Sequence, residues 1–98
     1  SDLPVFVMGD FNLLPESEPI KYLSKQFNDS KKISMLKPFG PTGTFNGFKF
    51  YEPVKDRIDY IFTNKEKVQV HKYAVLSDSK DCKYPSDHLP VVLEVEFK

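Results

Sequence analysis

The stretch Val5-Phe6-Val7-Met8-Gly9-Asp10-Phe11-Asn12 decides how this chain is organised. Its apolar part, Val5–Met8, follows a proline and stops at a glycine, which is the pattern of a short buried β-strand. The glycine permits a sharp exit from the strand, so Asp10 and Asn12 are expected to project together from its carboxyl end. The stretch therefore predicts a sheet whose edge carries polar side chains.

One helix is predicted after this strand. Ser17 is a candidate N-cap, and Pro19 is tolerated in the first turn. Ile20, Leu23 and Phe27 then recur at helical spacing and give the helix one apolar face that should cover a sheet. The polar residues 28–32 are expected to form a loop, and the short segment 33–36 is ambiguous.

Several further segments have the character of β-strands. Asn46-Gly47 between two short apolar runs, 42–45 and 48–51, is a strong hairpin signal. Other strands are expected at Ile58–Phe62, Val68–Leu76 and Leu89–Phe97, and the alternation in the last one is clear. We therefore predict an α+β fold, in which one mostly antiparallel sheet belongs to a layered sandwich. A single helix leaves the other face of this sheet uncovered, so something else should pack there.

Composition sets limits on the function. The 98 residues contain 14 basic and 14 acidic side chains, which argues against tight, salt-driven binding to duplex nucleic acid. No apolar run approaches the roughly 20 residues needed to cross a bilayer. The single cysteine, Cys82, excludes an internal disulfide and is interpreted as a surface thiol. The beginning at Ser1-Asp2-Leu3-Pro4 has no signal-peptide pattern and is expected to be an internal start just before a core strand.

The first motif with chemical potential is Gly9-Asp10-Phe11-Asn12. A carboxylate at the position of Asp10 can orient a water or bind a hard cation, and the amide of Asn12 can donate to a phosphoryl oxygen. Both residue types are also common in turns, so a purely structural turn is an equally good interpretation of this motif alone.

The second motif is Arg57-Ile58-Asp59-Tyr60. A carboxylate inside an apolar strand costs free energy unless it is hydrogen-bonded or paired. Arg57 is the structural candidate for the partner of Asp59, and an imidazole held in a fixed tautomer is the functional candidate. Asp56 competes for the same role, but strand alternation places it on the opposite face, so Asp59 is preferred.

The third motif is Ser86-Asp87-His88, directly before the last strand. An adjacent aspartate and histidine can serve a metal and a phosphoryl oxygen from one short segment, although such a pair alone usually has no function. The other histidine, His71, is expected to be solvated or packed within a strand. Asn46-Gly47 with its flanking phenylalanines could form a tip that faces a substrate, but an ordinary hairpin turn is the preferred interpretation.

Taken in order, the three motifs resemble the C-terminal half of the endonuclease/exonuclease/phosphatase family, and the resemblance covers nearly the whole chain. It implies a deoxyribonuclease I-like fold, a two-sheet sandwich flanked by helices that is about twice as long as this chain. The family's earlier motifs have no counterpart here. Residues 1–98 are thus expected to be the second half of such a domain, to pair with the missing half or with another copy, and to be inactive alone.

The resemblance also implies a role for each residue. Asp10 would orient or deprotonate the attacking water, and Asn12 would hold a non-bridging phosphoryl oxygen. His88 would bind the phosphoryl group and stabilise its charge, and Asp59 would orient the imidazole. Asp87, together with Asp10, would bind Mg²⁺ or Mn²⁺.

The implied activity is metal-dependent hydrolysis of a phosphate ester by attack of water at phosphorus, as a phosphodiesterase or a phosphatase. Two alternatives stay open. The first is an endonuclease or exonuclease acting on nucleic acid, which the balanced charge does not support. The second is a catalytically inert binding module on the same fold, which the complete set of motif residues disfavours.

Overall fold

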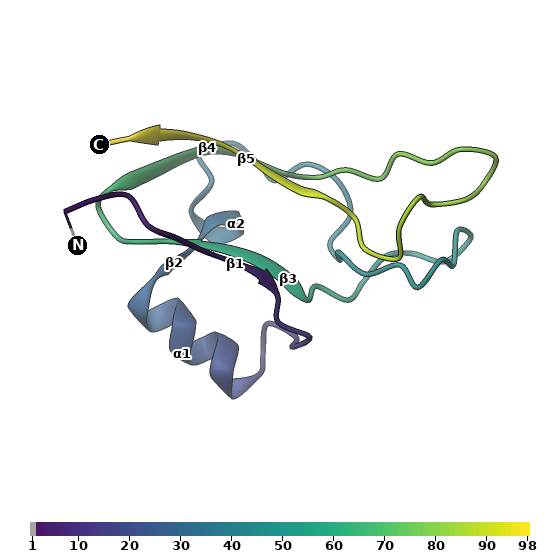
Figure 1. The fold of residues 1–98 in the computed structure, drawn as a ribbon, viewed down its shortest axis with the longest axis horizontal. Helices are drawn as coiled ribbons and strands as arrows, with labels where there is room; N and C mark the ends of the chain where they lie inside the picture. Colours follow the sequence, from purple (N-terminus) through teal and green to yellow (C-terminus); the bar gives the residue numbers. More distant parts are fainter. Residues whose placement is uncertain (1) are drawn as a thin grey trace.

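The computed structural model describes residues 2–98, so the expectation for Ser1 lies outside the described residues (Figure 1). The described chain contains seven elements, which are β1 (Phe6–Asp10), α1 (Glu18–Gln26), β2 (Asn28–Asp29), α2 (Ser30–Ile33), β3 (Asp59–Thr63), β4 (Val68–Val75) and β5 (Val91–Phe97). The strands form a three-stranded sheet in the order β1-β3-β2 and a two-stranded sheet of β4 and β5. All named strand pairs are antiparallel.

Helix α1 lies against one face of the three-stranded sheet (Figure 1). Its buried residue Ile20 packs against Tyr60 and Phe62 of β3, and Leu23 and Phe27 join this cluster as predicted. Ser17 is the N-cap residue, but its hydroxyl donates to the carbonyl of Leu14 and does not cap the helix. No helix within residues 2–98 is long and apolar enough to cross a membrane.

The opposite face of the same sheet is open at the end where Met8 lies. Met8 lies directly across from Ile61 in the β1–β3 register, and 58% of the Met8 surface is exposed. The prediction of a buried strand is therefore wrong for its end at Met8, although Phe6 on the same face packs against Phe97 of β5. Within residues 2–98 the expectation of an uncovered sheet face is confirmed at Met8 only, since Thr63 on the same face is fully buried.

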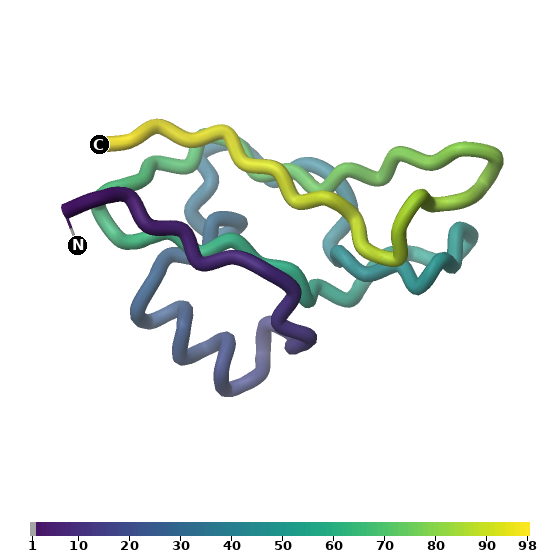
Figure 2. The backbone as a smooth tube through the Cα atoms, viewed as in Figure 1, coloured from purple at the N-terminus to yellow at the C-terminus, as the bar shows by residue number. Residues whose placement is uncertain are grey.

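The second sheet has its own core. Tyr73, Val75 and Leu89 are buried together, with Val91 and Leu93 packed beside them. The ambiguous segment after α2 runs along β4, where the amide of Leu36 donates to the carbonyl of His71. Figure 2 shows the chain leaving β4 through a long loop and returning as β5, and this loop carries the third motif.

Three expectations for the fold are corrected. The strands form two sheets where one was predicted, because alternation identifies strands but does not assign their neighbours. Residues 28–32 are not a loop, since Asn28 and Asp29 pair with β3 and helix α2 follows. The segments 42–45 and 48–51 do not pair as a hairpin, although the backbone does turn at Gly47 and Phe48. Phe45 forms its bridges with Asp56 and His88 instead.

Candidate active site

The register of the β1–β3 pair brings the first two motifs together. Asp10, the last residue of β1, lies directly opposite Asp59, the first residue of β3. Side chains at directly opposed positions of antiparallel strands have Cβ atoms about 4.5–5.5 Å apart and share one face of the sheet. Two like charges in this position would destabilise the pair, so the arrangement calls for a cation between the two carboxylates.

His88 lies beside both carboxylates. Its Nδ1 is 2.8 Å from Oδ2 of Asp59, and its Nε2 is 3.7 Å from Oδ2 of Asp10. The hydrogen bond to Asp59 raises the pKa of His88; burial acts in the opposite direction, and the charges of Asp59, Asp10 and Asp87 add to the increase. The histidine is therefore held toward its cationic form, with Nδ1 donating to Asp59 and Nε2 outside hydrogen-bonding distance of Asp10.

The third motif is held in place by residues 44–46. The amide of Asn46 donates to the carbonyl of Asp87 over 2.7 Å, and its side-chain Nδ2 donates to the carbonyl of Ser86 over 3.0 Å. The ring of Phe45 meets the imidazole of His88 edge-on, with 5.3 Å between centroids. The sequence favours an ordinary hairpin turn here over a tip that faces a substrate. The Asn46-Gly47 signal marked the right place, but nothing in it indicated that the asparagine side chain fixes a distant loop.

Asp10 and Asn12 share one exposed turn after β1. Oδ1 of Asp10 accepts from the amide of Asn12 over 2.9 Å, and Asn12 has a positive φ of 55°. Asparagine tolerates this left-handed conformation better than most residues. The turn interpretation is therefore correct for the backbone, while Oδ2 of Asp10 still faces His88.

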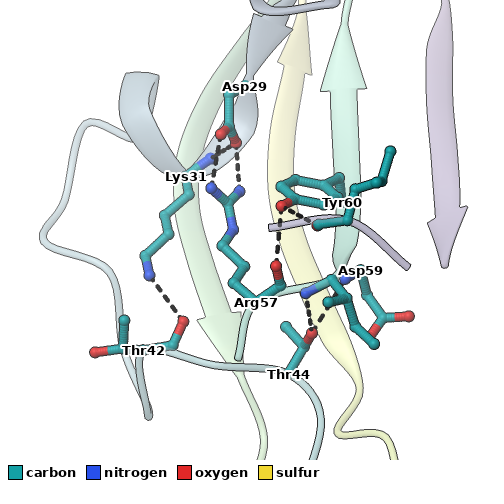
Figure 3. A network of polar contacts seen from close by, with 9 residues as sticks. Asp29, Lys31, Thr42, Thr44, Arg57, Asp59 and Tyr60 are labelled. Atoms are coloured by element: carbon teal, nitrogen blue, oxygen red, sulfur yellow. Dashed lines mark hydrogen bonds and ion pairs between the residues drawn. The ribbon is translucent and has the colours of Figure 1, made fainter. Parts of the chain in front are cut away.

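Arg57 is not the partner of Asp59. It is buried, and its Nη1 donates to Oδ2 of Asp29 over 2.7 Å (Figure 3). The guanidinium also lies over the rings of Tyr60 and Tyr73. The functional candidate, an imidazole, is thus the contact that Asp59 makes, and the proposed Arg57–Asp59 ion pair is wrong.

A divalent cation fits part of this site. One ligand atom each from Asp10, Asp59 and His88 lie within 4.8 Å of one another. An imidazole that holds its proton between carboxylates is a poor ligand, because metal ligands must be deprotonated. Mg²⁺ usually keeps several waters and binds through one or two carboxylates. The carboxylate of Asp10 suits such a site, because it lines an open cleft of about 290 Å³ between the β1–β3 pair and residues 89–91 at the beginning of β5. The half-buried Asp87 is not one of the three clustered residues.

Fold and site together define a class of proteins, the deoxyribonuclease I-like α+β sandwiches, of which these sheets and helices form half. The chain belongs to the endonuclease/exonuclease/phosphatase family, whose sequence model matches residues 1–88. Members of this family are hydrolases that act on phosphate esters.

Solved structures support the assignment. A conserved protein of unknown function from Enterococcus faecalis is 38% identical, with a TM-score of 0.87, over 97% of this chain and 37% of that one. A mannosyl-6-phosphatase from Bacteroides thetaiotaomicron is 32% identical, with a TM-score of 0.84, over 97% of this chain and 38% of that one. The sulfate-bound catalytic domain of human nocturnin is 27% identical, with a TM-score of 0.68, over 97% and 33%. A comparison with curated proteins finds no match.

Proposed function

We propose that this chain supplies the C-terminal half of a catalytic domain that hydrolyses small phosphate esters by attack of water at phosphorus. The observation that carries the proposal is the position of His88, hydrogen-bonded to Asp59 and facing Asp10. The chain spans 37% of the Enterococcus structure, so we assign the activity to a longer protein and expect the chain alone to be inactive.

In this mechanism the two sides of His88 do different work. Asp59 accepts from Nδ1 and fixes the ring, which leaves the Nε2 proton free to donate to a phosphoryl oxygen. The positive charge of the imidazolium then stabilises the negative charge that develops on the phosphoryl group. The side-chain amide of Asn12 donates to a second, non-bridging oxygen, while its backbone amide stays hydrogen-bonded to Asp10.

Asp10 acts on the water. Its Oδ1 accepts from the backbone amide of Asn12, which restricts the orientation of the carboxylate, and Asp10 lines the open cleft. From there it orients the nucleophile and accepts its proton as the oxygen attacks phosphorus. The bond between phosphorus and the ester oxygen then breaks, the departing oxygen takes a proton from solvent water to give the alcohol, and no bond to the protein forms.

We assign the metal site to the carboxylates of Asp10 and Asp87, which supply the hard oxygen ligands that Mg²⁺ and Mn²⁺ prefer. A bound divalent cation would neutralise phosphoryl charge and polarise the phosphorus–oxygen bond, an effect worth several kcal/mol.

A small phosphate ester is favoured over a nucleic acid as substrate. The chain carries no net charge, whereas tracking a polynucleotide backbone needs a basic surface. The similarity to a mannosyl-6-phosphatase favours a sugar phosphate. Because the chain is also similar to nocturnin, other phosphate esters should be tested as well. The substrate panel should contain hexose phosphates, a nucleotide and an oligonucleotide.

Metal removal tests the proposed function. Chelation of divalent ions should abolish phosphate release by the full-length protein, and Mg²⁺ or Mn²⁺ should restore it. Asp87→Asn should raise the Mg²⁺ concentration for half-maximal activity about tenfold or more, since altered metal sites lose this much affinity. Asp78→Asn, on the exposed loop after β4, is the matched control and should have no effect. Full activity in the chelator would contradict the proposal.

The pH profile tests the state of His88. Because the hydrogen bond to Asp59 raises the pKa of His88, the imidazolium form is present at low pH and is lost as the pH rises through that pKa. Asp59→Asn should therefore move the alkaline limb of kcat to lower pH. The control Asp56→Asn, an exposed neighbour, should leave the limb in place. An unmoved limb in Asp59→Asn would mean that the imidazolium is not the active form.

A further inference from the structure

Thr44 makes contacts that none of the three motifs explains. It is fully buried, and its Oγ1 accepts two hydrogen bonds, from the amide of Ile58 over 3.0 Å and from the amide of Asp59 over 3.1 Å. Figure 3 shows the hydroxyl pointing at the backbone where β3 begins. The hydroxyl of Thr44 therefore binds the backbone of Asp59, whose carboxylate is hydrogen-bonded to His88.

The backbone of Thr44 is hydrogen-bonded next to His88, the partner of Asp59. Its carbonyl accepts from the amide of Leu89 over 2.7 Å, directly after His88, and its amide donates to the carbonyl of Asp56 over 2.8 Å. Asp59 and His88 are 29 positions apart in the sequence. Thr44 accepts from the amide of Asp59 itself and from the amide of Leu89, the residue after His88.

Only a hydroxyl fits the position. At the beginning of β3 two successive amides need acceptors, and a hydroxyl oxygen offers two lone pairs. A valine has the same shape but no acceptor, so the buried amide of Ile58 and the half-buried amide of Asp59 would both lose this partner. Gly43 allows this close approach, because a Cβ at that position would lie 2.5 Å from the amide nitrogen of Asp56.

We propose that Thr44 is a positioning residue that sets the geometry of the Asp59–His88 pair for catalysis. The proposal rests on the proposed function, since it assigns Thr44 to the same site. A displacement of about 1 Å in a catalytic group can cost about 10²-fold in rate. The loss should fall on kcat, because Thr44 is fully buried and so makes no contact with a substrate.

The test uses three variants of the full-length protein. Thr44→Val should lower kcat about 10- to 100-fold, with KM changed by less than about twofold. Thr44→Ser keeps the hydroxyl and should recover kcat to within about threefold of the wild type. Thr63→Val is the matched control, because Thr63 is a fully buried threonine of β3 whose Oγ1 has no hydrogen-bond partner within residues 2–98. Equal kcat in Thr44→Val and Thr63→Val, or no recovery in Thr44→Ser, would overturn the proposal.

A spectroscopic readout separates this proposal from the proposed function. The Nδ1 proton of His88, donated to Asp59, should give a downfield proton resonance in ¹⁵N-edited spectra, assigned by its loss in His88→Asn. The resonance should disappear or move upfield in Thr44→Val and persist in Thr63→Val. If the wild type hydrolyses no phosphate ester, the proposed function fails, and an unchanged resonance in Thr44→Val would overturn the positioning role independently. If Thr44→Val does not fold, Thr44→Cys replaces it, since sulfur is a weak acceptor, and the same criteria apply.

Discussion

His88→Ala is expected to lower kcat of the full-length protein by about 10²- to 10⁴-fold, the range for removing a charge-stabilising donor or a general acid. The alanine removes the cation between Asp10 and Asp59, so the two opposed carboxylates repel each other as well. The measurement is steady-state hydrolysis of a hexose phosphate at saturating Mg²⁺.

The chain offers a matched control. His71 is its other histidine, half-buried on β4, where Nε2 lies 3.9 Å from Oε2 of Glu96. His71→Ala should leave kcat unchanged. Equal effects of the two substitutions would show that His88 has no special role in turnover.

Asp29→Ala is expected to destabilise the protein by about 3–5 kcal/mol, because removing one partner of a buried ion pair leaves an uncompensated charge. Arg57 is only 4% exposed, and its guanidinium has its two Asp29 hydrogen bonds in the described structure. Asp29 also accepts from the amide of Lys31 and so caps helix α2. The change should lower the urea midpoint at an unchanged m-value.

Two further variants show whether the loss of stability comes from breaking a buried ion pair. Glu94→Ala breaks an exposed pair with Lys72, at 3.5 Å, and should cost less than about 1 kcal/mol. The double variant Asp29→Leu/Arg57→Met removes both charges and should recover part of the loss. If Asp29→Ala costs no more than Glu94→Ala, the buried pair does not stabilise this fold.

The residues of the candidate site could be found in the sequence because each lies next to a strand end. Gly9-Asp10 ends an apolar run, Asp59 interrupts one, and His88 precedes one. A carboxylate in an apolar run costs free energy unless it has a hydrogen-bond or ion-pair partner. For Asp59 this leaves two candidate partners, Arg57 and an imidazole. The choice between them needed the structure.

The missed features are long-range contacts. Asp29 and Arg57 are 28 positions apart, and nothing local marks them as a pair, so the sequence of residues 28–32 predicts a loop. Asn46-Gly47 predicted a hairpin because that signal is local, but the neighbours of this segment are Asp56 and Asp87, which sequence proximity cannot identify. Alternation likewise gave the strands but not their division into two sheets.

The most direct test of the account is hydrolysis of a hexose 6-phosphate by the full-length protein in water labelled with a heavy oxygen isotope. We predict that the label enters the released inorganic phosphate, that none enters the sugar, and that His88→Ala releases phosphate at least about 10²-fold more slowly. Label in the sugar hydroxyl, or equal release by the wild type and His88→Ala, would contradict attack of water at phosphorus in a site built around His88.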